Sequence, residues 1–152
     1  MMMFPLFLSA AAAAATATPV AGGDAATRAA ILATCHDNID GQLEGDVARV
    51  ARSLHPSVVM RAVDTSPGHA ADALEIETRE TLLESTRKGE LKLPRAQWNR
   101  SCEILSIAGN AAVVKLETPA FVSFDEYGKF DGTWKIVQSF WTYKPRPKPA
   151  RP

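Results

Sequence analysis

The sequence has little cysteine, no cluster of metal-ligating residues and no excess of basic charge. Neither a CxxC nor an HExxH motif occurs in its 152 residues, so no metal and no cofactor are predicted. The formal net charge is zero, and four bases fall in the last nine residues, so the chain before Lys144 holds four more acids than bases. Such a domain lacks the basic face that phosphate binding needs, which argues against nucleic acid as the main partner.

The first 23 residues contain no charged side chain at all. An apolar start, an alanine run and the small-x-small pattern Ala15-Thr16-Ala17 predict a signal peptide over residues 1–23 and a secreted or periplasmic protein. The first basic residue is Arg28 and three methionines open the chain, so a later true start after an alanine-rich arm is the alternative. The run is mostly alanine and threonine, which argues against stable membrane insertion.

The two cysteines, Cys35 and Cys102, allow one disulfide at most. An oxidising compartment would permit them to pair. Each is also suited to packing alone as a small apolar side chain, one in a predicted helix and one in a predicted strand. The sequence leaves both possibilities open.

Helical patterns occupy the first half of the chain. Asp24 can cap a helix over residues 25–43, which Gly45 ends, and a shorter helix follows over residues 46–54 until His55-Pro56 stops it. Strands are predicted over residues 58–63 and 73–76. Thr78 is then a plausible cap for a third helix through Lys88, with Gly89 at its end.

The second half of the chain has the two-residue period of strands. We predict strands over residues 102–107, 111–117, 121–130 and 133–141, joined in hairpins by the turn formers Gly109-Asn110 and Asp131-Gly132. Helices followed by strands predict an α+β fold with three N-terminal helices packed on an antiparallel sheet. The domain spans residues 24–143, and the basic, proline-rich tail 144–152 is expected to stay disordered.

Three stretches carry a resemblance to a known family. These are "IDGQLEGDVARVARSLHP" from Ile39, "ETLLESTRKG" from Glu80 and "KFDGTWKIVQSFW" from Lys129. In this order they resemble the putative lumazine-binding family of the nuclear-transport-factor-2-like superfamily. The resemblance implies a strongly curved sheet wrapped around the helices, a conical pocket and a homodimer that pairs sheet faces. It makes a lumazine-like aromatic compound the candidate small-molecule ligand.

Four residues are candidates for binding such a ligand. Arg61 could reach an anionic group if its strand register turns it inward, and Trp98 offers a flat apolar surface. Alternation along a strand would place Asp125 and Tyr127 on the same face, as an acid and a donor. The alternative for each residue is a position on the surface or in the core without a role in ligand binding.

Other branches of the superfamily are isomerases, cyclases and dehydratases, which use an acid-base residue in an apolar cavity. Steroid-isomerase relatives place a base on the strand after the second helix, where this chain reads Met60-Arg61-Ala62-Val63, and use a first-helix tyrosine that this chain lacks. An enzyme would therefore rely on Asp125, or on His36 with Asp40.

We therefore expect a small-molecule-binding domain whose ligand the sequence does not identify. The alternatives are an enzyme of the isomerase, cyclase or dehydratase type, and an interaction module that binds a protein on its sheet face. The enzyme alternative predicts a perturbed pKa on an acid in an apolar cavity. The interaction module predicts an exposed aromatic patch.

Overall fold

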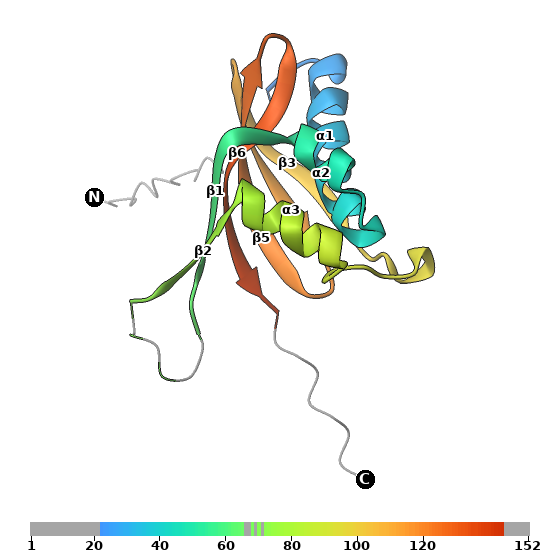
Figure 1. Ribbon diagram of the computed structural model, residues 1–152. Helices are drawn as coiled ribbons and strands as arrows, with labels where there is room; N and C mark the ends of the chain where they lie inside the picture. Colours follow the sequence, from blue (N-terminus) through green and yellow to red (C-terminus); the bar gives the residue numbers. More distant parts are fainter. Residues whose placement is uncertain (1–21, 66–67, 69, 71, 145–152) are drawn as a thin grey trace, which may run out of the picture.

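The computed structural model describes residues 22–65, 68, 70 and 72–144. Helices α1 (Ala25–Glu44), α2 (Val47–Ser53) and α3 (Arg79–Lys88) lie on one face of a sheet, and no helix of the described residues covers the other face (Figure 1). The strands are β1 (Leu54–Val63), β2 (Leu74–Thr78), β3 (Ser101–Ala108), β4 (Ala111–Glu117), β5 (Phe121–Phe130) and β6 (Thr133–Tyr143). A short 3-10 helix, η1 (Arg95–Gln97), precedes β3. The predicted signal segment up to residue 21 and the predicted tail from residue 145 lie outside the described residues.

The helix ends confirm the predicted caps. Asp24 accepts a hydrogen bond from the Thr27 backbone N–H at 2.8 Å, and Thr78 caps α3 in the same way through Thr81. Gly45 and Gly89 end α1 and α3 with positive φ angles of 78° and 72°. Glycine adopts this left-handed conformation without the steric cost of a Cβ atom.

The sheet confirms the α+β fold class, and its strand order adds one parallel pair. The order is β2-β1-β6-β5-β4-β3. Strands β3 to β6 form the predicted antiparallel meander, whereas β1 runs parallel to β6, so the sheet is mixed. After β2 the chain passes through α3 and η1 to the far edge, and four antiparallel strands then return it to β1. This pairing joins segments far apart in the sequence and leaves no local pattern.

Irregular pairings interrupt three strand pairs. In β6 the register shifts so that Tyr127 faces Ile136 while Glu126 faces Gln138, which leaves Val137 as the extra residue. A second shift falls at Leu105 in β3. Strand β1 begins at Leu54, four residues earlier than expected, because Leu54 pairs with Ile136 before the ladder breaks around Pro56 and resumes at Val59. Bulges bend strands, which fits the predicted curvature.

The core lies between α1 and the sheet. One side of α1 forms an apolar stripe that is buried, with Ile31, Cys35 and Ile39 fully inaccessible to solvent. Cys35 is joined to Cys102 of β3 by a disulfide, which settles the alternative that the sequence left open. The bridge fixes the first helix to the far edge strand across 67 residues of sequence.

Candidate functional site

A cavity of about 320 Å³ lies between the helices and the sheet. Its volume is at the lower end of the range of small-molecule pockets, about 300–1,000 Å³. Eight large apolar side chains line it: Leu54, Met60, Leu82, Leu91, Leu116, Phe121, Ile136 and Trp141. The inward side chains of β1 and β6 alternate with outward ones, and the Val137 bulge resets the alternation so that Ile136, Ser139 and Trp141 all face inward.

Asp125 is the buried acid of this cavity. Only 3% of it is exposed, and the Ser139 hydroxyl donates a hydrogen bond of 2.6 Å to its Oδ1 atom. Burial raises the pKa of Asp125 to about 6, although hydrogen bonds from Ser139 and Ser123 oppose the rise. A carboxyl with this pKa can either accept or donate a proton near neutral pH.

Three further carboxylates line the cavity toward solvent. Glu75 and Glu77 lie on β2 opposite Ala62 and Met60, and Glu90 follows α3. Burial, with repulsion from Glu75 and Glu90, raises the pKa of Glu77 to about 7. The Tyr143 hydroxyl donates to Glu75 at 3.2 Å.

Two amide side chains of α1 complete the polar lining. The Gln42 Nε2 atom donates to Asn38 Oδ1 at 2.9 Å, and Asn38 in turn donates to the Ser53 hydroxyl at 3.3 Å. Both amides are buried. Asn38 and Gln42 were not among the predicted site residues, although their four-residue spacing beside the apolar stripe of α1 is a local signal.

The structure places the four predicted ligand-binding residues in different surroundings. Asp125 and Tyr127 are buried on the same face of β5, as predicted, but only Asp125 lines the main cavity. The Tyr127 hydroxyl is buried without a hydrogen-bond partner, and burial raises the pKa of Tyr127 well above its ordinary value. Tyr127 borders a second depression that also includes Gly128 and Phe130.

Arg61 and Trp98 lie outside the main cavity. Arg61 alternates with the inward-facing Met60, so it lies on the outer face of the sheet beside Ile76 and Phe140. Trp98 donates from Nε1 to the Leu93 carbonyl oxygen at 3.0 Å. The guanidinium groups of Arg95 and Arg100 lie 4.9 and 5.5 Å from its ring centroid.

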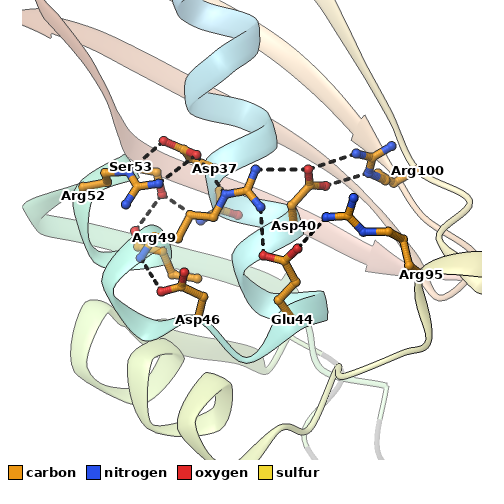
Figure 2. Close-up of polar contacts among 11 residues, drawn as sticks. Asp37, Asp40, Glu44, Asp46, Arg49, Arg52, Ser53, Arg95 and Arg100 are labelled. Atoms are coloured by element: carbon orange, nitrogen blue, oxygen red, sulfur yellow. Dashed lines mark hydrogen bonds and ion pairs between the residues drawn. The ribbon is translucent and has the colours of Figure 1, made fainter.

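The surroundings of Asp40 differ from those of a residue that orients a catalytic histidine. Asp40 is buried and accepts hydrogen bonds from Arg100 at 2.6 and 2.9 Å and from Arg49 at 3.2 Å (Figure 2). Burial alone would raise the pKa of Asp40, but Arg100 and Arg49 hold it below its usual range. Neither His36 nor Asp40 lines the cavity.

The arginines around Asp40 form part of a larger ionic network on the surface of α1 and α2. Arg49 also contacts Asp37 and Glu44, at 2.9 and 3.0 Å, and Figure 2 shows the acids of α1 pointing toward arginines from α2 and from the segment before β3. Arg52 bonds to Asp37, and Arg95 bonds to Glu44. The charged side chains in the stretch from Ile39 therefore hold the helices together, which is a structural role.

The described part of the chain contains neither a candidate metal site nor a candidate membrane-spanning helix. No group of three or more histidine, cysteine or carboxylate side chains there could hold a metal ion. No helix in the same part is long and apolar enough to cross a membrane.

Solved structures share the fold at low sequence identity. An NTF2-like protein of unknown function from Shewanella baltica is 17% identical, with a TM-score of 0.68 over 82% of this chain and 99% of its own. A counterpart from Silicibacter pomeroyi is 15% identical, with a TM-score of 0.65 over 78% and 97%. A ketosteroid isomerase-like protein from Erwinia carotovora is 13% identical, with a TM-score of 0.55 over 77% and 96%. At these identities the likeness shows the fold alone.

A family model gives the more specific assignment. No curated protein matches the chain. The model of the family described as "Putative lumazine-binding" matches residues 26–142, which cover α2, α3, all but the first residue of α1 and nearly the whole sheet. The chain therefore belongs to the family described as "Putative lumazine-binding", and it has the NTF2-like fold.

Proposed function

We propose that the protein binds a small, partly aromatic molecule in the cavity between the helices and the sheet. The observation that carries the proposal is a cavity of about 320 Å³ that combines apolar walls with a few convergent polar groups, ending at the buried Asp125. Small-molecule sites commonly have this composition. The family's description makes lumazine the first compound to test.

Lumazine binding is tested by following amide NMR signals during a titration. The proposal predicts saturable shifts at cavity positions such as Leu116, Ser123 and Ser139. The matched control is Ala120→Trp, because Ala120 is an exposed residue on the cavity lining and a large side chain there obstructs the cavity without disturbing the core. Shifts that persist in this variant, or that fall on the outer face of the sheet, would contradict binding in the cavity.

We also propose that the protein is exported. The disulfide between Cys35 and Cys102 supports this location, since such bonds persist mainly in oxidising compartments. The apolar, uncharged first 23 residues support it as well.

A homodimer through the outer face of the sheet is the proposed assembly. Phe124 and Phe140 are paired neighbours on that face and are 45% and 43% exposed, and Ile76 beyond Arg61 in the same row is 61% exposed. Adjacent exposed apolar side chains on a sheet are typical of a contact surface. A second copy offers the same patch and would cover it by two-fold symmetry.

An enzyme is the second candidate function, and the raised pKa of Asp125 favours it. A carboxyl with a pKa of about 6 in an apolar cavity suits the removal of a proton from carbon. The test is deuterium exchange into a ketone such as 5-androstene-3,17-dione. Exchange that is fast with the wild type and absent with Asp125→Asn supports the enzyme. Equal rates with the two proteins exclude this role for Asp125.

A further inference from the structure

We propose that the ligand of the cavity is an organic cation, a protonated amine or amidinium attached to an aromatic body. This inference rests on the proposed small-molecule function and adds the sign of the ligand's charge. Three observations support it: the charges that line the cavity, the pairing of another buried acid, Asp40, with arginines, and the aromatic side chains beside the cavity carboxylates.

The charges that line the cavity are all of one sign. Glu75 and Glu77 come from β2, Glu90 from the segment after α3, and Asp125 from β5. Among the described residues, no lysine, arginine or histidine lines the cavity and none forms an ion pair with any of these four carboxylates. The elements packed around them contribute only uncharged polar groups: Asn38 and Gln42 of α1, Ser85 of α3, Ser123 and Ser139 of the sheet, and the phenol of Tyr143.

The contrast with Asp40 shows that the fold can neutralise a buried acid. Asp40 and Asp125 are almost equally inaccessible, with exposed fractions of 6% and 3%. Asp40 carries hydrogen bonds from two arginines, whereas serine hydroxyls are the neighbours that stabilise Asp125. A buried carboxylate without a cation destabilises the fold, because its desolvation is not offset by an opposite charge. Asp125 therefore lacks a positively charged partner within the protein, and a cationic ligand would supply that charge.

Two of these carboxylates, Asp125 and Glu77, have pKa values that favour the neutral form. The pKa values of Asp125 and Glu77 are raised to about 6 and about 7, in both cases mainly by burial. A cation in the cavity would favour the charged form of each group and return both pKa values toward their ordinary range. An anionic ligand would add to the repulsion instead.

Three aromatic side chains can complete a cation site. Phe121, Trp141 and Tyr143 line the same cavity, and the rings of Trp141 and Tyr143 meet edge to face with centroids 6.4 Å apart. The faces of aromatic rings attract cations, and this attraction is stronger away from water. Carboxylates beside aromatic rings therefore favour a ligand in which an ammonium group and a flat ring adjoin.

The test compares compounds that share a ring and differ in charge. One series is tryptamine, tryptophol and indole-3-acetate, and a second is 1-naphthylmethylamine, 1-naphthalenemethanol and 1-naphthoate. Calorimetric titration of the full chain should show each amine binding at least about tenfold more tightly than its neutral and anionic counterparts, a difference expected of one well-placed charged contact. The affinity of the amines should rise as the pH increases from about 5.5 to about 8, through the raised pKa values of Asp125 and Glu77.

Two variants separate the local effect from net charge. The triple variant Glu75→Gln, Glu77→Gln, Glu90→Gln should weaken the preference for amines, because Asp125 is then the only one of the four cavity carboxylates that remains, and should keep binding of the neutral compounds. The triple variant Glu80→Gln, Glu103→Gln, Glu126→Gln removes the same charge from positions outside the main cavity and should keep the preference. Neutral or anionic compounds that bind as tightly as the amines would overturn the inference while the small-molecule function stands. Absence of binding by all six compounds would overturn the inference, and the lumazine titration with Ala120→Trp decides the small-molecule function separately.

Discussion

Asp125 differs from a free aspartic acid because its surroundings favour the neutral form. Its folded-state pKa of about 6 lies above the ordinary value of 3.8. The folded protein therefore binds more protons than the unfolded chain between these two values, and stability falls as the pH rises through this window. The cost is fully present above the folded-state pKa, where the buried carboxylate is charged.

Replacing Asp125 by Asn should stabilise the protein above its folded-state pKa. The amide has nearly the same shape, can accept the Ser139 hydrogen bond and carries no charge. We expect a gain of up to about 3 kcal/mol in the free energy of unfolding near pH 8, and little gain near pH 4, from the two-unit pKa shift. Urea unfolding at both pH values measures this difference.

The control for this variant is Glu126→Gln, which removes an exposed carboxylate from the next position of the same strand. It should leave stability nearly unchanged at both pH values. A loss of stability in Asp125→Asn near pH 8, or a gain equal at both pH values, would contradict the account of a carboxylate retained for binding.

At the residue scale, the sequence predicted which side chains share a face of the sheet where strand alternation alone determines this. Asp125 and Tyr127 share a face because they are two positions apart on β5. The direction of Arg61 depended on a register that its own segment does not encode. The inward direction of Glu75 and Glu77 follows from the pairing of β2 with β1, so the acidic lining of the cavity could not be read from the sequence.

At the scale of elements, the disulfide should contribute strongly to the attachment of α1 to the sheet. Closing a loop of this length restricts the unfolded chain and stabilises the fold by about 4 kcal/mol in the chain-entropy model. The variant Cys35→Ala, Cys102→Ala should therefore unfold at lower urea concentration than the oxidised wild type.

The matched control for the disulfide is the wild type after reduction, which keeps both side chains and breaks only the bond. Reduction should lower the urea midpoint in the wild type and leave the double variant unchanged. A reduced wild type as stable as the oxidised one would show that packing of Cys35, and not the bond, holds α1 in place.

The contact between Asp40 of α1 and Arg100 before β3 should also stabilise the arrangement of elements. Arg100→Met keeps an apolar stem and leaves a buried acid with one guanidinium partner in place of two, so we expect a loss of about 1–3 kcal/mol. The pKa of Asp40 lies below its ordinary value of 3.8, so this contribution is present above that value and is lost as the pH falls.

A double-mutant cycle with Asp40→Asn isolates the pair. Asp40→Asn removes the buried charge that Arg100→Met leaves without one of its partners. The double variant should therefore lose less free energy of unfolding than the sum of the losses in the two single variants. Additive losses measured by urea unfolding near neutral pH would mean that Arg100 acts through its contact with Trp98 and not through Asp40.

The elements that sequence patterns identified are those with local signals. Caps such as Asp24 and left-handed glycines such as Gly45 mark helix ends within a few residues. The parallel pair β1–β6 and the bulge at Val137 depend on contacts between distant segments. These two features place β1 beside β6 and turn Ile136 and Ser139 toward the cavity, so the fold class was predictable while the shape of the site was not.

At the scale of the whole molecule, the outer sheet face should hold two copies together. Phe124→Glu combined with Phe140→Glu places charges at the centre of the exposed row. Light scattering during gel filtration should give a dimer for the wild type and a folded monomer for this variant. Leu93→Glu, which changes an exposed apolar residue outside the sheet, should remain dimeric. A monomeric wild type would favour a different protein as the partner of this face.

The central claim is that the cavity holds a small molecule in the protein's own host. Native mass spectrometry of the wild type recovered from that host, with Ala120→Trp recovered in parallel, tests it most directly. We predict added mass on the wild type that is released on denaturation and is absent from Ala120→Trp, and an organic cation as the released compound. A wild type recovered without added mass, or with the same added mass on both proteins, would contradict the claim.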